Sequence, residues 1–226
     1  METSGVNYVF KCVIVGDSHV GKTTLLGRYM GEPSTSGRVS PASVSRQPFV
    51  QKLVHTRGGK TVELKIYDTL GQERYRSLTR SYFRDAQCCL VCFDVNNPSS
   101  FEHLIEWMND INKYIGDNHE SRTAKLIVGI ARQTMSSYDV PNGLCPRTSV
   151  HYCQPVTHDR AELFATQYNV PYKFVNIHDD DDVAMCFEAV VEQKVQELDK
   201  EDACLTLGQD SVDLRPGRNG RQSSCC

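Results

Sequence analysis

Apolar positions along this chain alternate between short continuous runs and longer runs with helical spacing. The short runs are rich in Val, Ile, Leu and Cys and have the length of buried strands. The Gly-rich segment at residues 57–60 joins two of them, which predicts an antiparallel hairpin. The predicted strands are residues 8–15, 50–56, 61–67, 88–94, 125–130 and 172–176.

Amphipathic runs lie between most of these strands and predict helices. Residues 99–115 open with serines that can cap a helix, and Thr157 can cap the helix that follows it. Asp182 can cap the last helix. The expected inner stripes are Phe101, Leu104, Ile105, Met108 and Ile111 in the first helix, and Val183, Phe187, Val190 and Leu198 in the last.

This alternation indicates one α/β domain over residues 1–198, with a mostly parallel six-stranded sheet, helices on both faces and one antiparallel hairpin. Residues 32–48 are rich in Pro and Ser, and residues 133–156 are irregular, so both are predicted to form loops. From Asp199 onward the composition is polar and the apolar period is lost. Residues 199–226 are therefore predicted to be a flexible tail.

Composition narrows the functional classes. A net charge of −3 and a pI near 6.2 argue against a protein that binds nucleic acid through bulk electrostatics. No apolar stretch is long enough to cross a bilayer, and the first residues do not form a signal peptide. Ten cysteines would suit a disulfide or zinc framework, but the chain lacks the paired CxxC spacing of strong zinc sites. Such a site at Cys145, Cys153, His151 and His158 is therefore not predicted.

The strongest chemical signal is GDSHVGKT at residues 16–23, which matches the phosphate-loop pattern GxxxxGK[ST] between a strand and a helix. Glycines let the backbone wrap phosphate oxygens, while amide groups and the helix N-terminus favour negative charge. Lys22 would reach the β- and γ-phosphates, and the Thr23 hydroxyl would ligate Mg²⁺. The fold is thus predicted to be that of a P-loop NTPase. The expected nucleotide-binding residues here are Asp17, Ser18, His19, Val20, Gly21, Lys22, Thr23 and Thr24.

A second signal is DTLGQE at residues 68–73, directly after a predicted strand. An aspartate at the C-terminal end of a strand beside a phosphate loop can hold magnesium through water, which assigns a metal role to Asp68. Gly71 would offer its backbone N–H to the γ-phosphate. Gln72 would orient the attacking water and is the expected catalytic residue.

The chain resembles the Rab branch of the Ras-like small GTPases. Residues 65–86 resemble the Rab switch region and the helix after it, and residues 89–107 resemble the next strand, loop and helix. This resemblance implies a switch that binds GTP/GDP with Mg²⁺, hydrolyses GTP and regulates vesicle-mediated transport. It also implies exchange factors, GTPase-activating factors, and effectors that contact Phe49, Tyr67 and Tyr82, although the family usually has tryptophan where Tyr67 stands.

The two terminal residues, Cys225 and Cys226, resemble the Rab double geranylgeranylation signal. Two prenyl groups give a stable anchor where one binds only marginally. The last residues also carry three arginines and no acid, which favours an anionic surface. We therefore expect the prenylation machinery as a partner and the cytoplasmic face of intracellular membranes as the location, with a cytosolic pool. The alternative is a tail with thiols that carry no lipid.

The chain departs from the family where guanine is read. The NKxD motif falls on residues 130–133, where Ile130 replaces the asparagine and Gln133 replaces the aspartate. Losing the two hydrogen bonds of that aspartate would weaken guanine binding about a hundredfold or more. The SAK motif becomes Asn176, Ile177 and His178.

The switch segments also differ from the family pattern. The threonine that closes over magnesium has no clear counterpart, with Ser43 and Ser45 as the nearest hydroxyls. Leu70 replaces an alanine and His19 is bulkier than the usual residue. Two classes therefore remain open: a working, slow GTPase, and a pseudo-GTPase that acts as a prenylated protein-binding scaffold. A P-loop kinase or ATPase is disfavoured by the Rab-like residues 65–107.

Overall fold

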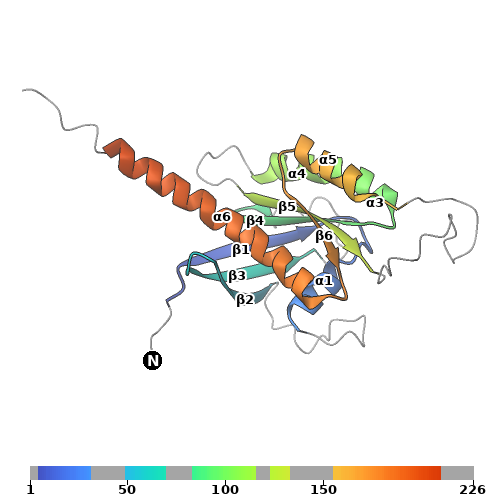
Figure 1. Cartoon of the computed structure of the whole chain (residues 1–226), viewed down its shortest axis with the longest axis horizontal. Coiled ribbons are helices and arrows are strands. Elements are labelled where there is room, and N and C mark those ends of the chain that lie inside the picture. Colours follow the sequence, from blue (N-terminus) through green and yellow to red (C-terminus); the bar gives the residue numbers. More distant parts are fainter. Residues whose placement is uncertain (1–4, 32–48, 70–82, 116–122, 133–154, 210–226) are drawn as a thin grey trace, which may run out of the picture. The chain divides into compact units, whose positions relative to one another are not determined.

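The computed structural model describes residues 5–31, 49–69, 83–115, 123–132 and 155–209 (Figure 1). The chain divides into two units, Met1–Lys194 and Val195–Cys226, and the strands described here belong to the first. The elements are β1 (Tyr8–Val15), α1 (Lys22–Tyr29), β2 (Val50–His55), β3 (Thr61–Asp68), β4 (Cys88–Asp94), α3 (Pro98–Glu102), α4 (Leu104–Ile115), β5 (Ala124–Ala131), α5 (His158–Gln167), β6 (Tyr172–Asn176) and α6 (Asp180–Gln209).

The strands form one six-stranded sheet in the order β2-β3-β1-β4-β5-β6. β1 pairs in parallel with β3 and β4, and β5 pairs in parallel with β4 and β6. Of the described strands, β2 alone runs antiparallel, with Val50 opposite Ile66 and His55 opposite Thr61. The predicted mostly parallel sheet with one antiparallel hairpin is therefore confirmed, and each strand lies within one residue of its predicted bounds.

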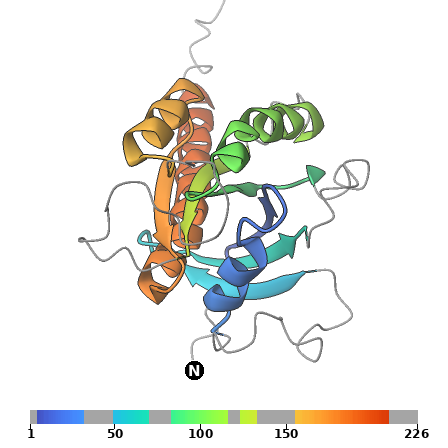
Figure 2. The same ribbon diagram turned by 90° about the vertical axis from the view of Figure 1, so that its right-hand side faces the viewer.

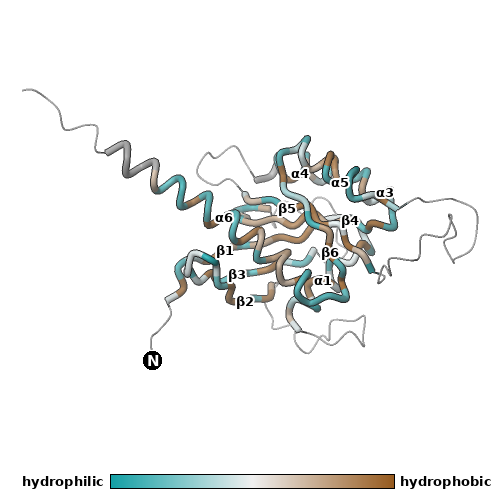
Figure 3. Tube along the Cα trace, viewed as in Figure 1, coloured by the Kyte–Doolittle hydropathy of each residue, from teal (hydrophilic) through white to brown (hydrophobic). Residues whose placement is uncertain are grey.

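Helices cover both faces of the sheet, as predicted (Figure 2). On one face, Tyr29 of α1 stacks on Phe187 of α6 with ring centroids 3.9 Å apart. On the other, Phe93 of β4 contacts Phe101 of α3, which in turn contacts Phe164 of α5. Burying a side chain of this size stabilises the fold by about 1.5–3 kcal/mol. Figure 3 shows the matching pattern, with apolar central strands between helices that are polar on their outer side.

Among the described residues, five cysteine thiols lie in this core. Desolvation raises the pKa of the Cys89 and Cys186 thiols to about 12, and it raises the pKa of Cys12 and Cys92 well above its usual value. They pack as small apolar side chains, as expected from the strand-like runs that contain most of them. The buried thiols are Cys12 on β1, Cys88, Cys89 and Cys92 on β4, and Cys186 on α6.

The predicted inner stripe of residues 99–115 was wrong at one position. Ile105 is 47% exposed, whereas Trp107 is 4% exposed and takes its place in the core. The helical run is broken at His103 into α3 and α4, and the α4 stripe then follows Leu104, Trp107 and Met108. Ile105 lies roughly 100° around the helix from Leu104 and faces solvent.

Of the two predicted N-terminal caps of α5 and α6, one is confirmed and one is wrong. The Thr157 side chain accepts a hydrogen bond from the Arg160 amide at 3.3 Å, so the predicted cap of α5 is confirmed. The prediction of Asp182 as the cap of α6 was wrong, because Asp179 fills that role. The Asp179 carboxylate accepts from the Asp181 and Asp182 amides, at 3.0 and 3.3 Å. Asp182 instead accepts from the Asn176 amide at 3.3 Å.

The helix α6 continues beyond the expected domain boundary at residue 198. Residues 199–209, which belong to the predicted flexible tail, are helical. They have no apolar period, but most are good helix formers such as Glu, Lys, Leu and Ala, and proline is absent from them. Intrinsic propensity thus extends the helix where the apolar pattern no longer does. The remainder of the predicted tail lies outside the described residues.

Candidate phosphate-binding site

The phosphate-loop sequence connects β1 to α1 at the carboxyl edge of the sheet. Because β1 lies between β3 and β4, the ends of all three strands meet beside this loop. Asp68 ends β3, and Asp94 ends β4. The topology therefore brings residues from three parts of the sequence to one edge.

The loop backbone turns sharply at three positions. Gly16 has φ 137° and Gly21 has φ 109°, conformations that favour glycine. A Cβ on Gly16 would lie 2.1 Å from the backbone oxygen of Cys92, so β4 approaches too closely for any other residue. His19 adopts φ 65° despite its side chain, at a cost of about 1–3 kcal/mol. Successive turns of this kind form the concavity that binds anions in phosphate loops.

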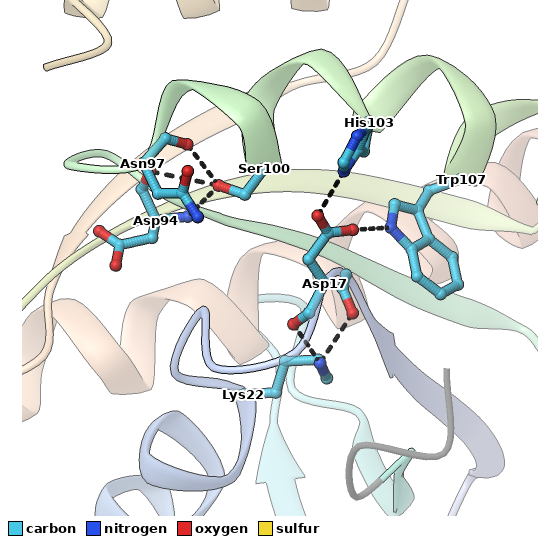
Figure 4. Close-up of polar contacts among 8 residues, drawn as sticks. Asp17, Lys22, Asp94, Asn97, Ser100, His103 and Trp107 are labelled. Carbon is cyan, nitrogen blue, oxygen red and sulfur yellow. Dashed lines mark hydrogen bonds and ion pairs between the residues drawn. The ribbon is translucent and has the colours of Figure 1, made fainter. Parts of the chain in front are cut away.

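Lys22 closes the loop from the first turn of α1. Its ammonium donates to the backbone oxygens of Gly16 and Asp17, each at 2.7 Å (Figure 4). The residue is only 4% exposed. A buried cation at the mouth of a turned backbone loop is the arrangement that receives a polyphosphate.

The expected metal-binding pair also lies together. Thr23 Oγ1 donates to Asp68 Oδ2 at 2.6 Å, although the two residues come from α1 and β3. The adjacent Thr69 donates to the Ile14 carbonyl at 3.2 Å and fixes the end of β3 against β1. Two side-chain oxygens therefore lie together next to Lys22, and oxygen is the ligand atom that magnesium prefers.

The other predicted site residues are divided between the loop and segments outside the described residues. Within the loop, Val20 is buried, Ser18 is half-buried, and His19 and Thr24 are exposed. Phe49 and Tyr67 lie together, with ring centroids 5.2 Å apart. The predicted site residues that lie outside the described part of the chain are Gly71, Gln72, Tyr82, Cys225 and Cys226.

Sequence reasoning missed two residues that hold the loop. The Asp17 carboxylate accepts from His103 Nδ1 at 2.6 Å and from Trp107 Nε1 at 2.9 Å (Figure 4). The hydrogen bond with Asp17 raises the pKa of His103 above its usual value. The two residues are four apart, the spacing of neighbours on one helix face, but nothing in the sequence links them to Asp17.

The described positions that correspond to the guanine-reading motifs, by contrast, do not present groups that are ready to bind a base. The side chains of Ile130 and Ile177 lie against Gly21, at 3.3 and 3.6 Å from the position that a Cβ would take there. His178 Nε2 lies 2.6 Å from the Arg132 backbone oxygen, and the Arg132 guanidinium pairs with Asp94 at 3.0 Å. These positions are apolar or already engaged within the chain. Gln133, at the position of the guanine-reading aspartate, lies outside the described residues.

A family model described as "Ras family" matches residues 11–196. The chain belongs to the Ras family. This Ras-family chain is 30% identical to the Ras-related protein Rab-3 of Caenorhabditis elegans over 223 residues, which is 97% of the chain and 90% of the relative. It is 30% identical to the Ras-related protein RABD2c of Arabidopsis thaliana over 220 residues, with coverage of 97% and 96%.

A third relative, the GTP-binding protein ypt1 of Schizosaccharomyces pombe, is 28% identical over 222 residues, covering 97% of the chain and 98% of the relative. The similarity to Rab and Ypt proteins therefore spans nearly the full length of each chain, and the resemblance to the Rab branch is confirmed. With Ile130 and Ile177 at its base-reading positions, the chain is a divergent member of that branch.

Proposed function

We propose that this chain is a Rab-like switch that binds and hydrolyses GTP at a membrane surface and regulates vesicle-mediated transport. One observation carries the proposal. The Lys22 ammonium closes the phosphate loop directly beside the hydrogen-bonded pair of Thr23 and Asp68. Family membership supports guanine as the base, because Ras-family relatives include proteins named as GTP-binding.

The residues at the loop fit a nucleoside triphosphate. The turns at Gly16 and Gly21 would form an anion-binding concavity, and Lys22 would donate to phosphate oxygens in place of the carbonyls that it contacts here. Each bond from a charged donor is worth about 1.5–3 kcal/mol. Phosphate contacts are thus expected to supply most of the affinity of this site.

The same site fits magnesium. The Thr23 hydroxyl would ligate the ion and Asp68 would hold one of its waters, and their 2.6 Å hydrogen bond keeps both oxygens together. When bound, magnesium would neutralise the charge of the phosphates during transfer to water. Such a site takes most of its ligands from phosphate and water. It is therefore compatible with the absence of any metal-holding group of three His, Cys, Asp or Glu side chains among the described residues.

Hydrolysis is assigned to Gln72, which would position the attacking water. Effectors would bind the surface of Phe49, Tyr67 and Tyr82. In that surface the Lys11 ammonium lies 5.0 Å from the Tyr67 ring centroid and the Lys65 ammonium 5.7 Å from that of Phe49. These cation–π contacts favour partners that can face a basic, aromatic surface. Exchange and activating factors would act on the same switch.

Membrane attachment is assigned to prenyl groups on Cys225 and Cys226, added by the prenylation machinery. Within the described residues, no helix combines the length and the apolarity that a membrane span requires. Two lipids and a basic tail would supply stable attachment to the cytoplasmic face of intracellular membranes, with a cytosolic pool.

A second candidate function is a pseudo-GTPase that binds partners without a nucleotide cycle. It is favoured by the base-reading positions, where Ile130 and Ile177 are apolar and the Arg132 carbonyl already engages His178. A prenylated scaffold would need none of the guanine contacts. Nucleotide binding separates the two candidates.

We expect the purified full-length protein to bind radiolabelled GTP at micromolar concentrations in the presence of magnesium. Unlabelled GDP should compete, and ATP should compete only at higher concentration. Bound GTP should be hydrolysed slowly in a single turnover, and more slowly still in Gln72→Leu, which retains binding. Absence of guanine-selective competition would exclude the GTPase and leave the pseudo-GTPase.

We expect the double variant Cys225→Ser with Cys226→Ser to lose membrane attachment, because neither lipid can be added. Fractionation of cells that express tagged protein should move it from the membrane pellet to the cytosol. The matched control is Ser223→Ala with Ser224→Ala, which keeps both thiols and should still pellet. Pelleting of the cysteine variant at the wild-type level would count against the anchor.

A further inference from the structure

Asp17 is held from two directions. Its backbone oxygen accepts from the Lys22 ammonium at 2.7 Å, inside the phosphate loop. Its carboxylate accepts from His103 at 2.6 Å and from Trp107 at 2.9 Å, outside the loop (Figure 4). A single residue therefore links the phosphate-binding cation to the helices α3 and α4.

The helical side of this link is hydrogen-bonded on both sides of His103. The His103 amide donates to the Ser99 carbonyl at 3.1 Å and ends α3, while the His103 carbonyl accepts from the Trp107 amide at 3.1 Å and begins the bonding of α4. Trp107 is only 4% exposed. Its indole N–H does not titrate, so His103 is the titratable one of the two donors to Asp17.

His103 is placed to respond to solvent. Its side chain is 50% exposed, and it lies at the junction between two helices rather than in the core. The charged groups that face it in the described part of the chain are all acidic. They are Asp17 in the loop, Glu102 on α3 and Glu106 on α4. Glu102 also forms an ion pair with Arg160 of α5, in which the guanidinium lies 3.7 Å from the carboxylate oxygen.

We propose that His103 is a positioning residue for the phosphate loop, and that loss of its proton weakens the retention of nucleotide. The proposal rests on the proposed function, since it needs a polyphosphate at Lys22. Two effects act in the same direction. The imidazolium holds Asp17 through a charge-assisted hydrogen bond, and its positive charge offsets a carboxylate that would otherwise repel the phosphates.

The direction of the pH effect follows from the contact with Asp17. That contact raises the pKa of His103. The stabilising charge-assisted hydrogen bond to Asp17 is therefore fully formed below the ordinary histidine pKa of about 6.5. It is lost as the pH rises through the higher pKa of the folded state. Nucleotide should therefore leave faster at alkaline pH. Because the His103 side chain is half-exposed, we expect a change of about two- to fivefold.

The first experiment measures dissociation of a fluorescent GDP analogue between about pH 6 and pH 9. Wild-type protein should release it about two- to fivefold faster at the upper end. His103→Asn keeps a neutral donor but cannot titrate, so its rate should change little with pH. The matched control is His158→Asn on α5, where an exposed histidine faces Glu162 at 3.8 Å, and it should keep the wild-type slope.

The second experiment uses full-length protein without nucleotide, so that failure of the proposed function does not hide the result. The amide NMR signals of the loop around Asp17 should titrate with the same pKa as the His103 ring, and this titration should vanish in His103→Asn. Independent titration of loop and ring would overturn the positioning role. A pH slope of release that persists in His103→Asn would overturn it as well. Failure of every nucleotide to bind would instead refute the proposed function.

Discussion

Substituting Lys22→Met should weaken the binding of GTP and GDP by about 10²–10⁴-fold. The ammonium is positioned to donate to phosphate oxygens, and two charge-assisted bonds are worth about 3–6 kcal/mol together. Its hydrogen bonds to the backbone oxygens of Gly16 and Asp17 are the ones that phosphate would replace. Equilibrium binding of a fluorescent nucleotide in the presence of magnesium measures the loss.

The matched control for Lys22 is Lys125→Met. Lys125 lies on β5, where its ammonium donates to Asn112 Oδ1 of α4 at 2.5 Å, and it has no role in the proposed site. Its nucleotide affinity should stay within a factor of about two of the wild type. Thermal unfolding of both variants without nucleotide shows whether they fold. A folded Lys22→Met protein with wild-type affinity would contradict the assignment of the loop.

Substituting Gly16→Ala should destabilise the domain by about 2–5 kcal/mol. The new Cβ would lie 2.1 Å from the Cys92 backbone oxygen, so β1 and β4 would have to separate at the edge that carries the site. Overpacking of this kind costs about 1–3 kcal/mol, and the backbone conformation adds about 1–2 kcal/mol for a residue with a side chain. Urea unfolding followed by circular dichroism measures the change.

Gly59→Ala is the comparison for Gly16→Ala. Gly59 also has a positive φ, 74°, but a Cβ there would meet nothing within 4 Å. Its cost should be only the conformational part, about 1–2 kcal/mol. Equal costs for the two variants would mean that the ends of β1 and β4 do not approach as closely as described.

The fold was predictable because its determinants are local. Each buried strand is a continuous apolar run such as residues 88–94, and the Gly-rich turn at 57–60 sets the hairpin. The phosphate loop was equally accessible, since its residues are contiguous and lie between a strand and a helix. Thr23 and Asp68 were each assigned to magnesium from their motifs, and their hydrogen bond follows from the strand order, which places both at the same edge of the sheet.

The errors arose where tertiary contacts or helix propensity decide the structure and the apolar pattern of the sequence does not. Asp17 and His103 are 86 positions apart, and only the adjacency of β1 and β4 brings them together. Ile105 and Trp107 exchange places because the helix is interrupted at His103. Asp179 rather than Asp182 caps α6, since four consecutive aspartates offer the same cap chemistry and the sequence does not choose among them.

The buried thiols bear on how the chain is modified after synthesis. Prenyl transfer and most oxidants act on a sulfur that is ionised and accessible. Cys12, Cys89, Cys92 and Cys186 are neither, because desolvation keeps them protonated near neutral pH and the sheet encloses them. In the folded chain these core sulfurs would therefore not compete as nucleophiles with Cys225 and Cys226, the proposed lipid-bearing thiols. Folding would thus remove these four thiols from the modification proposed for the terminal pair.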